Sequence, residues 1–193
     1  MVILYGGAFN PPTIAHLAII KYLRVKYPNS KLLVMPTNNK YKNESLIDYH
    51  HRYKMVELLV KGIPNIEVSN FELVQNDKYL GTADTLAKLN HPFFVMGADA
   101  LRKIDTWINP ENLIKDNHFL VFPRDGINIL EIIDASPLLS KYRDHFVVID
   151  DFKEINCSST AFRIDKDYKL VTKEVLDYIK QNHLYFGSEE YVL

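Results

Sequence analysis

Short apolar runs alternate along this chain with segments whose apolar residues recur at helical spacing, and this alternation is the strongest constraint on its fold. Val2–Tyr5 is an apolar run closed by two glycines, and a helical apolar stripe follows over 14–25. Repeated strand–helix units imply right-handed crossovers and a parallel sheet covered by helices on both faces. We therefore expect an α/β fold with a doubly wound parallel sheet. Further strands are expected at 31–35, 66–68, 93–96, 119–122 and 146–149, and further helices at 48–60, 82–89, 98–107, 111–115 and 172–181.

Length and charge limit the classes of protein to consider. The 193 residues suit one domain over 1–193, with a C-terminal helical part from about 156 to 193. A net charge of −1 provides no bulk attraction to nucleic acid or membrane, and no apolar run approaches the roughly 20 residues that span a bilayer. The one cysteine, Cys157, cannot form an internal disulfide. We expect a cytoplasmic protein with neither nucleic acid nor membrane as a partner.

The loop after the first apolar run has the properties of a phosphate-binding loop. Gly6 and Gly7 let the backbone approach a ligand closely, and the next helix presents free N–H groups and a positive dipole end to an anion. His16, in the first turn of that helix, can stabilise phosphoryl oxygens as a cation or as an N–H donor. The loop lacks both G-x-G-x-x-G and the P-loop pattern, which argues against a dehydrogenase or a P-loop kinase. A plain strand-to-helix turn would explain the same residues.

A second polar segment follows the last apolar run. Ser158, Ser159 and Thr160 can cap a helix and present hydroxyl and N–H groups to a phosphate. Arg163 lies one turn further and can reach the same anion with its guanidinium. An ordinary helix capped by serine is the alternative interpretation of this segment.

Together the two segments resemble the signatures of HxGH-type nucleotidyltransferases, in particular the bacterial nicotinate-nucleotide adenylyltransferase family, and the likeness extends over nearly the whole chain. Three positions depart from the usual first signature, because Asn10, Thr13 and Ala15 replace Asp, His and Gly. The residues that match are Gly6, Gly7, Phe9, Pro11 and His16 in the first signature, and Ser158, Ser159, Thr160 and Arg163 in the second.

The resemblance implies a Rossmann-like nucleotidylyl transferase fold and transfer of adenylate from ATP, with Mg²⁺, to nicotinate mononucleotide. It implies His16, Arg163 and Thr13 as catalytic residues, with the Thr13 hydroxyl on phosphate. The implied ATP-binding residues are Gly6, Gly7, Ala8, Phe9, Asn10, Asp99, Ser158, Ser159 and Thr160. The implied residues for the pyridine mononucleotide are Lys42, Arg52, Thr85, Trp107 and Arg124.

Simpler interpretations of several of these residues stay open. A lone tryptophan such as Trp107 is more often part of a core than a stacking platform, and Asp99 could cap a helix. His50 and His51 suggest a metal pair, but neighbours on a helix point to different sides, so we predict no metal site.

The acceptor and the activity also have alternatives. Nicotinamide mononucleotide is the alternative acceptor, and a non-catalytic nucleotide sensor is the alternative class, supported by the departures at Asn10 and Thr13. A related transferase that adenylylates phosphopantetheine usually has a shorter chain and lacks the element that contains Trp107. The sequence leaves a homodimer open.

Overall fold

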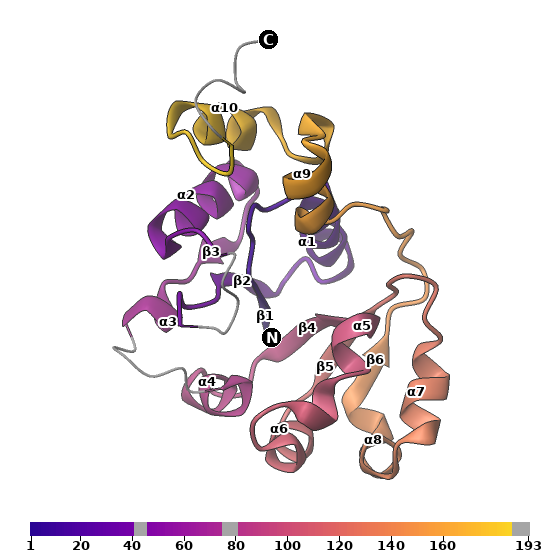
Figure 1. The fold of residues 1–193 in the computed structure, drawn as a ribbon. Coiled ribbons are helices and arrows are strands. Elements are labelled where there is room, and N and C mark those ends of the chain that lie inside the picture. Colours follow the sequence, from indigo (N-terminus) through magenta and orange to yellow (C-terminus); the bar gives the residue numbers. More distant parts are fainter. Residues whose placement is uncertain (41–45, 75–80, 187–193) are drawn as a thin grey trace.

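In a computed structural model that describes residues 1–40, 46–74 and 81–186, six parallel strands form one sheet within the described residues (Figure 1). Their order across the sheet is β3-β2-β1-β4-β5-β6. This arrangement confirms the predicted α/β fold with a doubly wound parallel sheet. The strands are β1 (Val2–Gly7), β2 (Lys31–Pro36), β3 (Ile66–Val68), β4 (Phe93–Gly97), β5 (Phe119–Phe122) and β6 (Phe146–Val148).

Helices follow the strands in the expected alternation, and several have polar caps that the sequence indicates. Asp48 accepts a hydrogen bond from the His50 N–H and so begins α2, and Thr172 caps α10 in the same way. The helical segments are α1 (Ile14–Lys26), α2 (Tyr49–Val60), α3 (Phe71–Val74), α4 (Thr82–Lys88), α5 (Ala98–Leu101), η1 (Ile104–Thr106), α6 (Pro110–Asp116), α7 (Ile129–Ala135), α8 (Pro137–Lys141), η2 (Arg143–His145), α9 (Ser159–Asp165), η3 (Tyr168–Leu170) and α10 (Lys173–Gln181).

The sheet separates two apolar cores, because successive side chains of a strand face opposite sides. On β1, Ile3 and Tyr5 pack with α1, α2, α9 and α10, whereas Leu4 packs with α4, α5, α6, α7 and α8. The two helix groups lie on either side of the strands in Figure 1. Both faces of the central strands are therefore apolar, which explains why β1, β4 and β5 are nearly continuous apolar runs in the sequence, whereas the edge strand β3 includes the exposed Glu67.

The strand order reverses between β1 and β4. The chain builds β2 and β3 outward from β1, and it then returns to place β4 on the other side of β1. Loops that follow β1 and β4 therefore diverge at their carboxyl ends, and such a point in an open α/β sheet is the usual place for a ligand.

The structure also differs locally from the sequence expectation. The helix predicted through Trp107 is two short pieces, α5 and η1, and it ends before that residue. The sequence did not predict α3 and α8, which have four and five residues and are too short to show a clear helical period, and it also missed α7, which has seven. No helix in the described part of the chain is long and apolar enough to cross a membrane.

Candidate functional site

The loop between β1 and α1 holds His16 in one orientation. Thr13 begins α1, and its backbone N–H donates to His16 Nδ1 over 2.9 Å. The Thr13 hydroxyl lies 2.8 Å from the same nitrogen, and its side chain is fully buried. The structure thus places the Thr13 hydroxyl against the His16 imidazole, and its contact with phosphate stays a prediction.

These contacts also decide the tautomer of His16. A backbone N–H can only donate, so Nδ1 is an acceptor and the proton of the neutral ring is on Nε2. Burial, and to a smaller extent the positive charge of Arg124, lowers the pKa of His16 from 6.5 to about 4. Of the two forms that the sequence left open, the structure favours the neutral N–H donor.

The low pKa of His16 predicts a loss of stability in mild acid. The unfolded chain binds a proton on this histidine near pH 6.5, and the folded protein only near pH 4, so stability is full above pH 6.5 and falls as the pH drops towards 4. By pH 5 the free energy of unfolding should have lost about 1–2 kcal/mol through this residue. Urea denaturation of the wild type and of His16→Gln between pH 7.5 and 4.5 measures the loss, which the variant should lack. Equal losses would mean that His16 titrates normally.

Among the described residues, two cavities flank this loop at the switch point, and His16 lies in the smaller one, of about 290 Å³. Asp99 and Arg124, which follow β4 and β5, share it with His16. Gly97 leaves room for the Asp99 carboxylate, which a Cβ at that position would touch. The residues that line this cavity are Tyr5, Ala15, His16, Ile19, Val95, Met96, Gly97, Asp99, Phe122, Pro123, Arg124, Phe152, Glu154, Ile155, Cys157, Ser158, Ser159 and Thr160.

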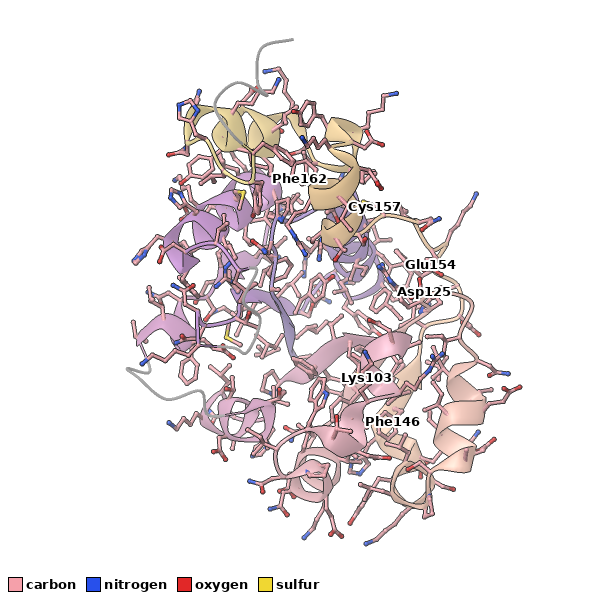
Figure 2. All side chains as sticks on the ribbon, viewed as in Figure 1. Lys103, Asp125, Phe146, Glu154, Cys157 and Phe162 are labelled. Carbon is pink, nitrogen blue, oxygen red and sulfur yellow. The ribbon has the colours of Figure 1, made fainter. Side chains whose placement is uncertain are left out.

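The second signature closes over the same cavity. Ser158 caps α9 by accepting from the Ala161 N–H, as the sequence predicted. The Ser159 hydroxyl donates to the carbonyl of Pro11 over 2.7 Å, so α9 is tied directly to the first loop. Figure 2 shows Cys157 at the start of α9 and Phe162 on the helix itself. The two signatures, far apart in the sequence, form one wall.

Arg163, on α9, contacts the first loop. Its Nη1 donates to the carbonyl of Asn10 over 2.5 Å, and its Nη2 donates to the Thr160 hydroxyl over 3.3 Å. Asn10 and Phe9 are both nearly fully buried, so their side chains pack inside the protein beneath the loop.

The larger cavity, of about 720 Å³, lies on the other side of β1. Thr85 and Trp107, two of the five residues that the resemblance assigned to the mononucleotide, line it together. Gly6, Gly7 and Ala8, which we expected at ATP, also line this cavity and not the smaller one. Lys42 lies outside the described residues. The lining residues are Leu4, Gly6, Gly7, Ala8, Met35, Thr37, Lys40, Glu72, Thr82, Thr85, Phe94, Ala100, Thr106, Trp107 and Ile108.

Two residues assigned to the mononucleotide lie elsewhere. Arg124 is in the smaller cavity with His16, where its Nη1 donates to the Cys157 carbonyl. Arg52 is completely buried and lines neither cavity. Its guanidinium donates to four oxygen atoms of described residues, namely Ala8 O at 2.8 Å, Thr37 O at 2.7 Å, Ile47 O at 2.9 Å and Asn39 Oδ1 at 3.0 Å. Arg52 therefore joins the loops after β1 and β2 and positions them from beneath.

Sequence reasoning missed several residues that line the cavities. Glu154 lies at the edge of the smaller cavity and accepts from the Asp125 N–H, and Figure 2 shows the two residues close together. Glu72 lines the larger cavity from α3, a helix of four residues that has no periodic signal. Burial raises the pKa of the Glu72 carboxyl, against the opposing effect of the hydrogen bond from the Asn38 N–H. In the described part of the chain, no group of three or more His, Cys, Asp or Glu side chains could hold a metal ion.

Comparisons with known proteins identify the family of this chain. The model of the cytidylyltransferase-like family matches residues 4–164. A protein of Acholeplasma laidlawii named "Probable nicotinate-nucleotide adenylyltransferase" is 33% identical, with 96% of this chain and 97% of that protein covered. A protein of the same name from Carboxydothermus hydrogenoformans is 31% identical, with 94% and 96% covered.

Solved structures show the same fold. Nicotinic acid mononucleotide adenylyltransferase of Plasmodium falciparum complexed with NaAD has a TM-score of 0.80 at 21% identity, over 95% of this chain and 96% of that one. The same enzyme complexed with APC has a TM-score of 0.78 at 22% identity, with the same coverage. From the family match and from its relatives in sequence, the chain belongs to the cytidylyltransferase-like family and, within it, to the nicotinate-nucleotide adenylyltransferases.

Proposed function

We propose that this protein transfers adenylate from ATP to nicotinate mononucleotide, producing nicotinate adenine dinucleotide and pyrophosphate on the route to NAD. The observation that carries the proposal is the pair of cavities that lie on either side of β1 near its carboxyl end. Neighbouring residues face different cavities, since Tyr5 lines the smaller and Gly6 the larger, and Asp99 the smaller and Ala100 the larger. Two nucleotides, one in each cavity, would thus direct their phosphates towards each other at the carboxyl end of β1.

The smaller cavity is assigned to ATP. His16, Arg124 and the residues Ser158–Thr160 gather donors there, and the N-terminus of α1 adds its dipole. Asp99 is the acceptor for a sugar hydroxyl. The larger cavity is assigned to the mononucleotide, with Trp107 facing the electron-poor pyridinium ring.

The chemistry is an in-line displacement at the α-phosphorus of ATP. An oxygen of the mononucleotide phosphate forms the new P–O bond, and the bond to the β-phosphate oxygen breaks and releases pyrophosphate. The nucleophile is already an anion, so the protein needs no strong base, and catalysis rests on positioning and charge stabilisation. His16 donates Nε2–H to the phosphoryl oxygens, Thr13 holds the ring in that tautomer, and Arg163, held beside the first loop by its contact with Asn10, adds positive charge near the polyphosphate.

Magnesium belongs to the substrate in this proposal. Mg²⁺ is usually bound by phosphate oxygens and water with few protein ligands, so it enters with ATP. We also place the reaction in the cytoplasm, in agreement with the single, buried and unpaired cysteine, Cys157.

The test is pyrophosphate release from MgATP with nicotinate mononucleotide or nicotinamide mononucleotide as the acceptor. We expect the wild-type protein to release pyrophosphate. Its kcat/KM should be higher for nicotinate mononucleotide than for nicotinamide mononucleotide. A higher kcat/KM for the nicotinamide form would reverse the acceptor assignment. ATP binding with no turnover on either acceptor would favour the nucleotide sensor.

Two variants test which cavity takes which substrate in the same assay. Trp107→Ala should raise the KM for the mononucleotide about tenfold and leave the KM for ATP unchanged, because a stacking contact of 1–2 kcal/mol is lost. Arg124→Ala should raise the KM for ATP and leave the KM for the mononucleotide unchanged. If Arg124→Ala instead raises the KM for the mononucleotide, the interpretation from sequence is right and the assignment of the smaller cavity is wrong.

A further inference from the structure

The segment after α10 returns to the first loop through one tyrosine. Leu184 and Phe186 are both buried in the core that contains α1, α2 and α10. Tyr185, between them, donates its hydroxyl to Asn10 Oδ1 over 3.0 Å, across 175 residues of sequence. Tyr185 has a φ of +72°, a left-handed conformation that a bulky residue rarely adopts, so the surrounding packing holds this contact in place.

The direction of this hydrogen bond follows from a second contact. The backbone N–H of Ile47 lies 3.3 Å from the same Asn10 atom, and a backbone N–H can only donate. The atom is therefore the amide oxygen, and the Tyr185 hydroxyl must be the donor. Asn10 thus has its side chain held by Tyr185 while its carbonyl accepts from Arg163.

The ring of Tyr185 also reaches the helix that carries Arg163. It packs edge-on against Phe162, with ring centroids 5.9 Å apart. Arg163 is the next residue, so the hydroxyl and the ring of Tyr185 support the two ends of the Arg163–Asn10 contact.

We propose that Tyr185 is a positioning residue for adenylyl transfer, acting through Asn10 on Arg163. Tyr185 lines neither cavity, so it does so without touching a substrate. The inference rests on the proposed function, in which Arg163 stabilises the polyphosphate during transfer.

The test compares two tyrosine hydroxyls of the C-terminal part. Tyr185→Phe keeps the ring and removes the bond to Asn10. Tyr178→Phe is the matched control, because its hydroxyl pairs with His51 Nδ1 at 2.9 Å and joins α10 to α2 instead. Tyr185→Phe should lower kcat about three- to tenfold, the usual effect of one hydrogen bond, with the KM for the mononucleotide unchanged. Tyr178→Phe should leave kcat as in the wild type.

The same substitution in an Arg163→Ala background separates positioning from general support. If Tyr185 acts through Arg163, adding Tyr185→Phe to Arg163→Ala should not lower kcat below that of Arg163→Ala alone. Because the Arg163→Ala background is slow, both variants are assayed over hours. An equal loss in both backgrounds, a wild-type kcat for Tyr185→Phe, or an equal loss in Tyr178→Phe would each overturn the proposal.

A second measurement does not depend on turnover. The Nε–H NMR resonance of Arg163 should shift in Tyr185→Phe and stay unchanged in Tyr178→Phe. An unshifted resonance would overturn the link between Tyr185 and Arg163, even if the enzyme is active. A shifted resonance would support that link even if the wild type fails to release pyrophosphate. That failure would contradict only the proposed function.

Discussion

Replacing His16 with alanine is expected to lower kcat for adenylyl transfer about 10²–10³-fold, with little change in the KM for the mononucleotide. His16 lines the smaller cavity, and the contacts of Nδ1 with Thr13 leave Nε2–H as the donor that the ring can present there. A preorganised donor to developing charge is worth this much in other phosphoryl and acyl transfers. Pyrophosphate release with saturating MgATP measures the effect.

Two further variants separate the possible roles of this histidine. His16→Gln keeps an N–H donor near the position of Nε2 but cannot become a cation, so it should recover part of the lost rate if the neutral tautomer acts. Thr13→Val removes the hydroxyl beside Nδ1 and keeps the backbone N–H, so it should lower kcat by about tenfold or less. A glutamine variant as inactive as the alanine variant, with wild-type activity rising below pH 6, would show that the imidazolium is the active form.

Arg52→Met is expected to lower the free energy of unfolding by about 3–5 kcal/mol, because four oxygen acceptors of described residues lose their buried donor. The side chain is completely buried, so no water replaces the guanidinium. Urea denaturation at pH 7.5 measures the change, and the loops after β1 and β2 should lose protection from hydrogen exchange together.

Arg24→Met is the matched control for this prediction. Arg24 also donates to backbone carbonyls, of Pro28 and Ser30, but it is only partly buried. Its loss should cost about 1 kcal/mol. If Arg52→Met unfolds like the wild type and instead raises the KM for the mononucleotide, Arg52 contacts the ligand, as the resemblance implied.

The sequence alone was sufficient for the parts of this protein that depend on local pattern. Both faces of the central strands are buried, so those strands are nearly continuous apolar runs, and the repeated alternation with helices predicts a parallel sheet. The two polar segments stand out because ligands in such folds bind beyond the carboxyl ends of strands. His16 and Ser158 are predictable because each lies at the start of a helix beside a strand end.

Only the tertiary structure decided what each polar side chain faces. Arg52 and Arg124 have similar chemistry and both follow the family pattern, yet one is buried beneath the loops and the other lines a cavity with His16. Gly6 and Tyr5 are neighbours in sequence and face different cavities, because successive residues of a strand face opposite sides of the sheet. Tyr185 meets Asn10 across 175 residues through packing that no local pattern encodes. Local periodicity thus determines the elements and their order, whereas burial and contact between distant segments decide which side chains are left to act on a substrate.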